Sequence, residues 1–348
     1  MEVRELRFRN ASNVPRLGDP RRVPSYAYVN WGLPLGSNRH ESDELYRSEW
    51  EGGSPKQMQV VVDAITQSGL GNFSQMLRDI NARAVAHIAE RSQTRVRYLE
   101  PGAGVSTINV YQTLLRKGLD LQKIQATLVE PSRERLGATV DALKRMDLKE
   151  GKDFIAFQCR DVDMLSFIQP ASQDIVSLVA TLHHHAYIDT PLSIFYRILA
   201  NSGLIMIADW HNSMWEHPAR VYQALREDYD WPSKEEDLAR FLAIYPNATE
   251  RPWSDDFDFE ANRMIREFWR SYGKIKAQEI ADGQFKEEDD ILMLEGHRPV
   301  EQYLKELDAA GFLLSSRIPE LIEALKLNGS PHQLLPDSSI LMFTLASK

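Results

Sequence analysis

Cysteine is nearly absent from this chain, and its absence excludes two kinds of site. The 348 residues include one cysteine, Cys159. No disulfide within the chain and no multi-cysteine zinc site can therefore form. A single thiol fits a reducing compartment, so we expect the protein in the cytoplasm.

Long hydrophobic runs are also missing. The longest, IVSLVATL, is far shorter than a membrane span, and the first ten residues, MEVRELRFRN, lack the apolar core of a signal peptide. We therefore expect a soluble protein with no membrane partner.

Positive charge is scarce relative to negative charge. The chain carries 41 Lys and Arg against 50 Asp and Glu, a net charge of −9. Residues 211–296 carry the whole imbalance, with 20 acidic and 11 basic residues. This charge argues against a broad basic face for nucleic acid, and we expect a small-molecule partner instead. A homodimer is compatible with the sequence.

The first 94 residues divide into an arm and a helical pair. Residues 1–54 contain eight arginines, no lysine and several prolines, which predicts an irregular arm. Residues 55–94 predict two helices. Ser54 can cap the first, with Pro55 at its first position, and the second shows apolar residues at spacings of three and four from Phe73 onward.

From Arg95 the pattern changes to short apolar runs that alternate with helical stretches. The runs are VRYLE, IQATLVE, DFIAFQ, DIVSLVATL and GLIMIAD, followed by the pair GFLLSSRI and SSILMFTLAS. Runs that are apolar on both faces are typical of a parallel sheet covered by helices. The sequence predicts an α/β, doubly wound domain over 95–210 and 297–348, with a mostly parallel seven-stranded sheet and an antiparallel last strand.

Residues 211–296 interrupt this domain and predict an inserted helical cap rich in tryptophan and acid. Aromatic faces with nearby carboxylates suit a flat or cationic organic acceptor. Candidate substrate-binding residues are Trp210, His211 and Trp215. The alternative is that the aromatic rings form the core of the cap itself.

A glycine turn follows the first predicted strand, in the stretch YLEPGAGVST. Gly102 and Gly104 remove side chains at a place where a ligand in this kind of sheet would touch the backbone. Glu130 ends the second strand, where a carboxylate can accept both hydroxyls of a ribose. Asp161 follows the third, within reach of an exocyclic amine such as that of adenine. A nucleoside ligand follows from this set.

The same turn argues against a dinucleotide. Thr107 stands where the dinucleotide fingerprint has a third small residue, and Glu100 would repel a pyrophosphate but attract an ammonium group. We infer a nucleoside that carries an amino acid.

These residues resemble the motifs of the class I S-adenosylmethionine (SAM)-dependent methyltransferases. The acid-x-Gly-x-Gly motif of that family matches EPGAG, its second-strand acid matches Glu130, and its acid after the third strand matches Asp161. The resemblance implies that SAM is the cofactor, with its methionine end at the glycine turn, its ribose at Glu130 and its adenine at Asp161. The cofactor-binding residues implied are Glu100, Gly102, Ala103, Gly104, Glu130, Asp161, Val162 and Ala180. One departure is the long interval from Gly104 to Glu130, which RKGLDLQKIQ can absorb as a loop.

The run ATLHHHAYID follows the fourth predicted strand and supplies candidate bases. His184 or His183 could remove a proton from the acceptor, although packing or a loop hydrogen bond is the alternative reading. His211 and Asp209 invite a metal-site reading, but Asp209 more simply caps the next helix, and we expect no metal.

Methyl transfer to oxygen or nitrogen of a small organic acceptor is therefore the expected activity. Two readings compete with it: a non-catalytic scaffold that uses the acidic, tryptophan-rich insertion, and aminopropyl transfer from decarboxylated cofactor.

Overall fold

The computed structural model describes eight stretches of the chain, which include the whole sheet. They are residues 55–185, 188–210, 217–227, 234–244, 259–284, 300–314, 318–325 and 341–348. The predicted arm 1–54 lies outside the described residues.

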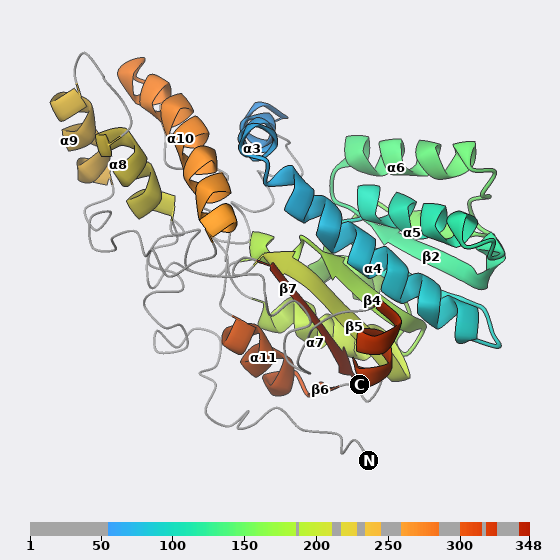
Figure 1. Ribbon diagram of the computed structural model, residues 1–348. Coiled ribbons are helices and arrows are strands. Elements are labelled where there is room, and N and C mark those ends of the chain that lie inside the picture. The colour runs from blue at the N-terminus through green and yellow to red at the C-terminus, as the bar shows by residue number, and fades with distance from the viewer. Residues whose placement is uncertain are drawn as a thin grey trace.

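A seven-stranded sheet in the order β3-β2-β1-β4-β5-β7-β6 forms the centre of the molecule (Figure 1). The strands are β1 (Val96–Pro101), β2 (Ile124–Val129), β3 (Phe154–Phe157), β4 (Gln173–Val179), β5 (Leu199–Trp210), β6 (Leu313–Leu314) and β7 (Leu341–Ser347). The first five run parallel, whereas β7 runs antiparallel between β5 and β6. The predicted α/β class, the mostly parallel sheet and the antiparallel last strand are confirmed.

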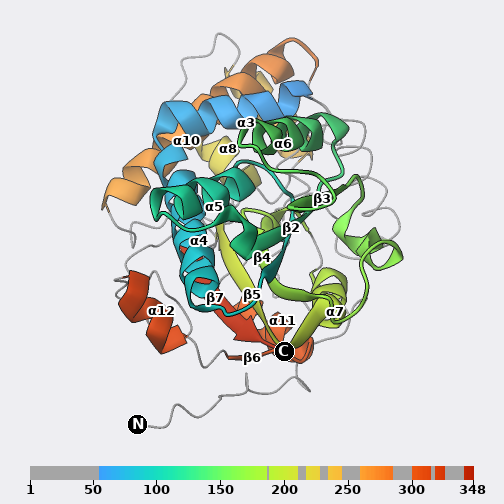
Figure 2. The same cartoon turned by 90° about the vertical axis from the view of Figure 1, so that its right-hand side faces the viewer.

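The helices of the described stretches cover both faces of this sheet or lie beyond its end. They are α3 (Pro55–Ser68), α4 (Gly71–Arg91), α5 (Val105–Arg116), α6 (Arg133–Arg145), α7 (Asp189–Ile198), α8 (His217–Glu227), α9 (Lys234–Ile244), α10 (Phe259–Ala281), α11 (Val300–Ala309) and α12 (Ile318–Leu325). Helices α4, α5 and α6 pack side by side on one face, and α7 and α11 lie on the other (Figure 2). Because both faces are covered, β1 and β2 are buried almost throughout, which explains their unbroken apolar runs.

The crossover between β1 and β2 explains the long interval noted in the sequence. Helix α5 ends at Arg116, and a loop with a short 3₁₀ turn, Leu121–Lys123, then leads into β2. The extra residues lie at the end of the unit far from the glycine turn, so they leave the turn undisturbed.

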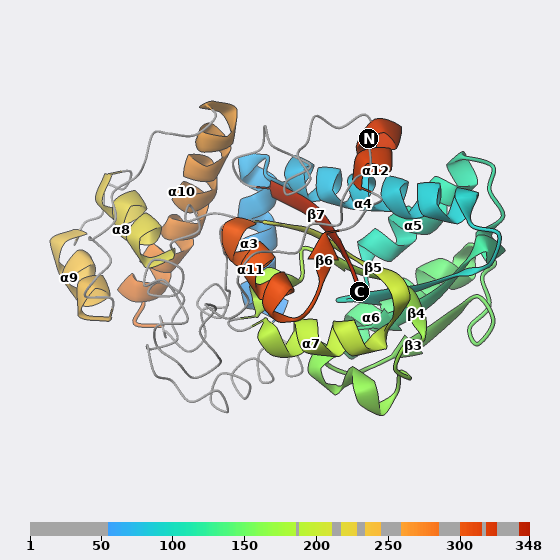
Figure 3. The same cartoon turned by 90° about the horizontal axis from the view of Figure 1, so that it is seen from below.

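The two predicted amino-terminal helices separate in space. Helix α4 packs against α5 and the sheet, whereas α3 packs against α10. Helices α3, α8, α9 and α10 thus form one group, which lies beyond the end of the sheet toward which β5 runs (Figures 1 and 3). The segment 211–296 is helical where it is described.

The aromatic side chains of α10 belong to the core of this helical group. Phe268, Trp269 and Tyr272 are each at most 2 % exposed. Their rings contact one another with centroids 5.0–5.8 Å apart. The second reading of the cap aromatics is therefore the correct one for these three rings.

The end of the chain differs from the prediction. Among the described residues of the run GFLLSSRI, Leu313 and Leu314 form strand β6, and the last residue, Ile318, begins the unpredicted helix α12. Helix α12 packs on α4, and Arg83 holds its carboxyl end by donating to the Leu325 carbonyl at 2.6 Å.

None of the helices in the described stretches is both long and apolar enough to cross a membrane.

Candidate functional site

A crevice with a volume of about 150 Å³ opens at the carboxyl ends of β1, β2 and β4. Its lining includes Gly102, Gly104, Glu130, Asp161 and Ala180. The structure thus brings together residues that lie far apart in the sequence, at the edge of the sheet where ligands of such folds bind.

The glycine turn is shaped by contact between two strand ends. Gly102 has φ +69°, and a Cβ on it would meet Thr181 Oγ1 at 3.0 Å. Gly104 has extended backbone, and a Cβ there would find no protein atom nearer than 3.9 Å. Gly102 is therefore required by the fold, whereas Gly104 keeps space open in the crevice. Ala103 between them is fully buried and donates its N–H to the Val129 carbonyl.

Glu100 lies beneath the glycine turn and is not among the residues that line the crevice. Its Oε2 accepts hydrogen bonds from the Tyr98 hydroxyl and, at 2.8 Å, from the Thr107 hydroxyl. The carboxyl group is 1 % exposed, and burial raises its pKa to about 7 although these hydrogen bonds oppose the shift. Glu100 supports the turn from beneath.

The raised pKa of Glu100 predicts a pH-dependent stability. The unfolded carboxyl titrates near 4.5 and the folded one near 7, so the folded state holds the proton more tightly. The resulting stabilisation is complete below the pKa of the unfolded state and is lost as pH rises through the pKa of the folded state. We expect Glu100→Gln to increase the free energy of unfolding by about 2–3 kcal/mol at about pH 8, and to change it little at about pH 4.

Chemical denaturation of both proteins across this range measures the difference. Parallel stability curves for Glu100→Gln and the parent protein would contradict the assignment of a buried, titrating carboxyl group.

Glu130 lines the crevice as the sequence predicts. It is 2 % exposed, and its Oε1 accepts the Ser132 N–H at 2.9 Å. Burial raises its pKa, while the charge of Arg135 and the Ser132 amide act in the opposite direction. Helix α6 begins directly after Ser132, so the start of the helix fixes the carboxylate at the end of β2.

Asp161 also lines the crevice and is 7 % exposed. Its Oδ2 lies 2.7 Å from His185 Nε2. The two atoms are as close as the atoms of an ion pair, but they do not have the alignment of a linear hydrogen bond. Val162 follows in the same 3₁₀ helix, Asp161–Ser166, and its side chain lies outside the described part of the structure.

The three consecutive histidines point to three different places. His183 Nδ1 lies 2.6 Å from Asp209 Oδ1, at the end of β5. His185 lies against Asp161, after β3. His184 lines the crevice between them, and burial followed by the neighbouring His183 lowers its pKa well below the usual range. Of the two candidate bases, the structure thus places His184 in the crevice and His183 beside it, with ring centroids 4.0 Å apart.

Asp209 makes contacts other than the helix cap expected of it. Its Oδ2 accepts the N–H groups of Leu182 and His183, and its Oδ1 accepts that of Trp210 at 2.8 Å. The fully buried carboxylate therefore ties the histidine turn to β5. Trp210 ends β5 and is 4 % exposed, whereas His211 and Trp215 lie outside the described residues.

Ala180, the last of the implied cofactor residues, stands between β4 and this turn. It has φ +50°, a left-handed conformation that alanine rarely adopts. It lines the crevice and donates its N–H to the Ala208 carbonyl at 2.8 Å. A strained residue at a strand end is frequent at ligand sites.

Sequence reasoning missed the basic residues of the crevice, Arg78, Arg135 and Arg160. Arg160 is paired with Asp163 at 2.9 Å. The charge of Arg135 acts to lower the pKa of Glu130. Arg78, from α4, has no hydrogen bond or ion pair to any described residue. Burial lowers its pKa, and the charges of nearby acids, including Glu100, act in the opposite direction. No sequence signal marks Arg78, since it lies on the polar side of an ordinary amphipathic helix.

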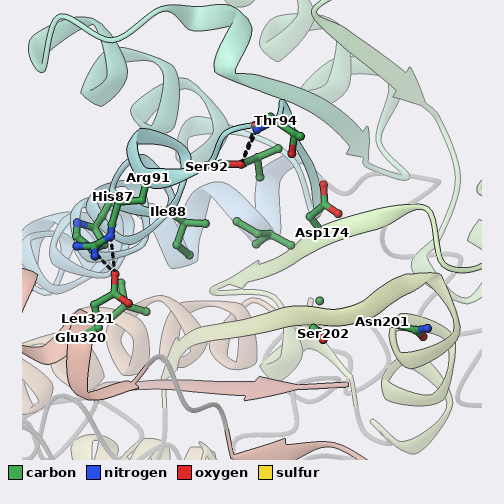
Figure 4. Close-up of a pocket in the computed structure, with 13 residues that line it drawn as sticks. His87, Ile88, Arg91, Ser92, Thr94, Asp174, Asn201, Ser202, Glu320 and Leu321 are labelled. Atoms are coloured by element: carbon green, nitrogen blue, oxygen red, sulfur yellow. Dashed lines mark hydrogen bonds and ion pairs between the residues drawn. The ribbon is translucent and has the colours of Figure 1, made fainter.

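A second cavity, of about 410 Å³, opens at the opposite edge of the sheet (Figure 4). There, Glu320 Oε1 lies 2.9 Å from His87 Nε2 and 3.1 Å from Arg91 Nε. Because these polar side chains pair with one another, nothing in the lining calls for a ligand. In the described part of the chain no group of His, Cys, Asp and Glu could hold a metal ion.

No protein-family model matches the chain, and no curated protein matches it significantly. Solved structures with a similar fold do exist. The plantazolicin methyltransferase BpumL in complex with SAH is 12 % identical and covers 89 % of this chain and 98 % of its own, with a TM-score of 0.40. A SAM-dependent methyltransferase from Mesorhizobium loti is 14 % identical over 76 % and 96 %, with a TM-score of 0.38. One from Aquifex aeolicus is 15 % identical over 44 % and 72 %, with a TM-score of 0.28.

The seven strands of the sheet lie in the order β3-β2-β1-β4-β5-β7-β6, with β7 antiparallel. The antiparallel β7 agrees with the fold that the sequence resemblance implies. The low identities and TM-scores establish no shared activity, so the functional assignment rests on the crevice residues.

Proposed function

We propose that the crevice binds SAM and that the protein transfers its methyl group to a small organic acceptor. The observation that carries this proposal is one arrangement of three groups. Two buried carboxylates, Glu130 and Asp161, flank a stretch of bare backbone at Gly104, and Arg78, a cation with no partner among the described residues, lies beside them. This set complements an adenosine that carries an amino acid.

The nucleoside half of the ligand matches the carboxylates and the apolar walls. Glu130 ends β2, where it can accept the two ribose hydroxyls. Asp161 lies one strand further along the edge, where it can accept the amine of adenine. Val129, Pro131 and Val179 line the same crevice and offer apolar surface to the purine ring.

Arg78 is the residue that we assign to the carboxylate of the methionine end. Its guanidinium is partly buried and stays charged at neutral pH, so it loses hydration without a described partner. A carboxylate ligand would form the charge-assisted pair that it lacks. The same reasoning disfavours aminopropyl transfer, because decarboxylated cofactor has no carboxylate to offer Arg78.

Bound SAM would supply a methyl group already activated by its sulfonium. The protein then has to align the acceptor and exclude water. A base is needed when the acceptor is a hydroxyl or an ammonium group. We assign this role to His184, which faces the crevice and is neutral at pH 7 because its pKa is lowered.

His183 is the second candidate base, and Asp209 fixes its proton. A carboxylate can only accept, so His183 Nδ1 carries the hydrogen in the 2.6 Å contact with Asp209 Oδ1. The neutral ring then has its lone pair on Nε2, which is the arrangement that a general base requires.

The acceptor site belongs, in this proposal, to the helical group α3, α8, α9 and α10 together with Trp210. This group follows β5 in the chain, apart from α3, and lies beyond the sheet edge that carries the crevice (Figure 1). His211 and Trp215 stay candidate acceptor contacts. A scaffold would need large exposed apolar patches on the group, and among its described residues Val62 is the only exposed large hydrophobic side chain.

Calorimetry with S-adenosylhomocysteine tests the proposal directly. We expect dissociation constants in the micromolar range for SAM and for this demethylated product. Absence of heat with both ligands would reject the function. Turnover of methyl-labelled SAM with fractionated small-molecule extracts then tests transfer, and tight binding without product in any fraction would favour the scaffold.

Arg78→Met adds a control to the same titration. Methionine keeps much of the length and packing of the side chain but removes the charge, so S-adenosylhomocysteine should bind about 10–100-fold more weakly. Methylthioadenosine, which lacks the amino-acid end, should bind the variant and the parent equally. Equal loss for both ligands would show that Arg78 acts on the fold rather than on the carboxylate.

A further inference from the structure

The histidine run places a partner beside the carboxylate that our proposed function assigns to adenine. His185 follows β4, and Asp161 follows β3, so the two side chains reach one another across the crevice edge. Their closest atoms, Nε2 and Oδ2, are 2.7 Å apart. Both side chains are more than nine-tenths buried and both line the crevice.

We propose that His185 is a positioning residue that holds Asp161 in place to select adenosine over its deaminated analogue. The inference rests on the proposed function, since it concerns the base-binding end of the same crevice. It adds His185, to which the sequence analysis assigned no role.

Asp161 depends on such a partner because of where it lies. It begins a 3₁₀ helix and is 7 % exposed. A buried carboxylate is costly unless an opposite charge or a donor compensates it. His185 provides this compensation and restricts the rotation of the Asp161 side chain.

The contact leaves Asp161 able to read a base. A carboxylate has about four lone-pair directions on two oxygens, and His185 approaches only Oδ2. The amine at position 6 of adenine is a donor, so it matches the remaining oxygen sites. Hypoxanthine presents a carbonyl oxygen at that position, which a fixed carboxylate repels. Discrimination therefore requires that Asp161 cannot turn away, and this is what His185 prevents.

The histidine on the other side of the turn serves a different purpose. His183 is tied to Asp209 at the end of β5, away from the base-binding end. Loss of His185 therefore releases Asp161, while the Asp209 contacts with the backbone of Leu182 and His183 keep the turn in place.

The test compares S-adenosylhomocysteine with S-inosylhomocysteine by calorimetry on the full chain. We expect His185→Ala to weaken binding of the adenosyl ligand at least about tenfold, since a hydrogen bond or ion pair to a charged group is involved. Binding of the inosyl ligand should change less than about twofold, so the ratio of the two dissociation constants should fall about tenfold. His185→Gln, which keeps a donor of similar reach, should restore part of the ratio.

Two further variants sharpen the result. His87→Ala removes a similar histidine–carboxylate pair, with Glu320, at the opposite edge of the sheet, and should leave the ratio unchanged. In an Asp161→Ala background, His185→Ala should have no further effect on the ratio, because the two residues act as one unit. If His185→Ala does not fold, His185→Gln and the Asp161→Ala protein carry the comparison.

The outcomes separate this inference from the proposed function. If the parent protein binds neither ligand, both fail. If it binds the adenosyl ligand but His185→Ala weakens both ligands equally, or changes neither, the proposed function stands and the role of His185 is wrong.

Discussion

Replacing Gly104 by valine is expected to abolish binding of S-adenosylhomocysteine, with an affinity loss of at least about a hundredfold, while the protein stays folded. A Cβ at this position meets no protein atom nearer than 3.9 Å, and the residue lines the crevice. The added side chain would therefore occupy ligand space rather than displace protein. The φ of Gly104, −165°, lies outside the left-handed region, and loss of glycine at the start of α5 should cost at most about 1 kcal/mol.

Two other glycines give this experiment its controls. Gly71 opens α4, a Cβ added to it would meet nothing within 4 Å, and it does not line the crevice, so Gly71→Val should leave ligand binding unchanged. Gly102→Ala should behave in the opposite way to Gly104→Val. Its positive φ and the 3.0 Å approach to Thr181 predict a loss of about 1–2 kcal/mol in unfolding free energy.

Calorimetry and chemical denaturation of the three variants separate the two effects. Normal binding by a folded Gly104→Val protein would show that the glycine turn does not contact the ligand, and the placement of the motif would be wrong.

The strands were predictable because their signal is local. A strand covered on both faces must be apolar on both faces, and β1, β2 and β4 show this directly in the sequence. The end of the chain was harder. GFLLSSRI has the apolar character of a strand, but only Leu313 and Leu314 pair with β7, and Ile318 instead begins a helix that packs on α4. A contact with a helix more than two hundred residues earlier cannot be inferred from a short apolar run.

Among the acids of the site, too, some positions could be predicted from local sequence and others could not. Strand ends are visible in the sequence, so Glu130 and Asp161 could be placed at one edge. The hydrogen-bond partners of Glu100 were not predicted, although a local signal existed: Tyr98 lies two residues earlier, on the same face of β1, and its hydroxyl bonds the carboxylate. An apolar strand that contains both a tyrosine and a glutamate favours a buried pair over a ligand contact.

The basic and histidine residues depend on tertiary structure. Arg78 reaches the crevice only because α4 packs against α5 beside the glycine turn. The three histidines occupy a short 3₁₀ turn and the residue after it, where successive side chains diverge, and their partners come from different strand ends. The sequence alone does not show which acid each histidine meets.

Asp209→Ala is expected to cost about 3–5 kcal/mol of unfolding free energy, the largest stability effect of any substitution considered for this protein. The carboxylate is fully buried and accepts the N–H groups of Leu182, His183 and Trp210 as well as His183 Nδ1. Removing it leaves these donors without an acceptor in a place where water does not enter easily.

Asp174 provides the matched control for this prediction. It accepts three hydrogen bonds from Arg97, the shortest at 2.6 Å, but its side chain is 36 % exposed. Water can replace those bonds, so Asp174→Ala should cost less than about 1 kcal/mol. Chemical denaturation of the two variants compares a buried carboxylate with an exposed one that makes nearly as many bonds. Equal losses of unfolding free energy in the two variants would show that the Asp209 contacts do not hold the histidine turn on β5. The assignment of a proton to His183 Nδ1 in its contact with Asp209 would then lose its basis.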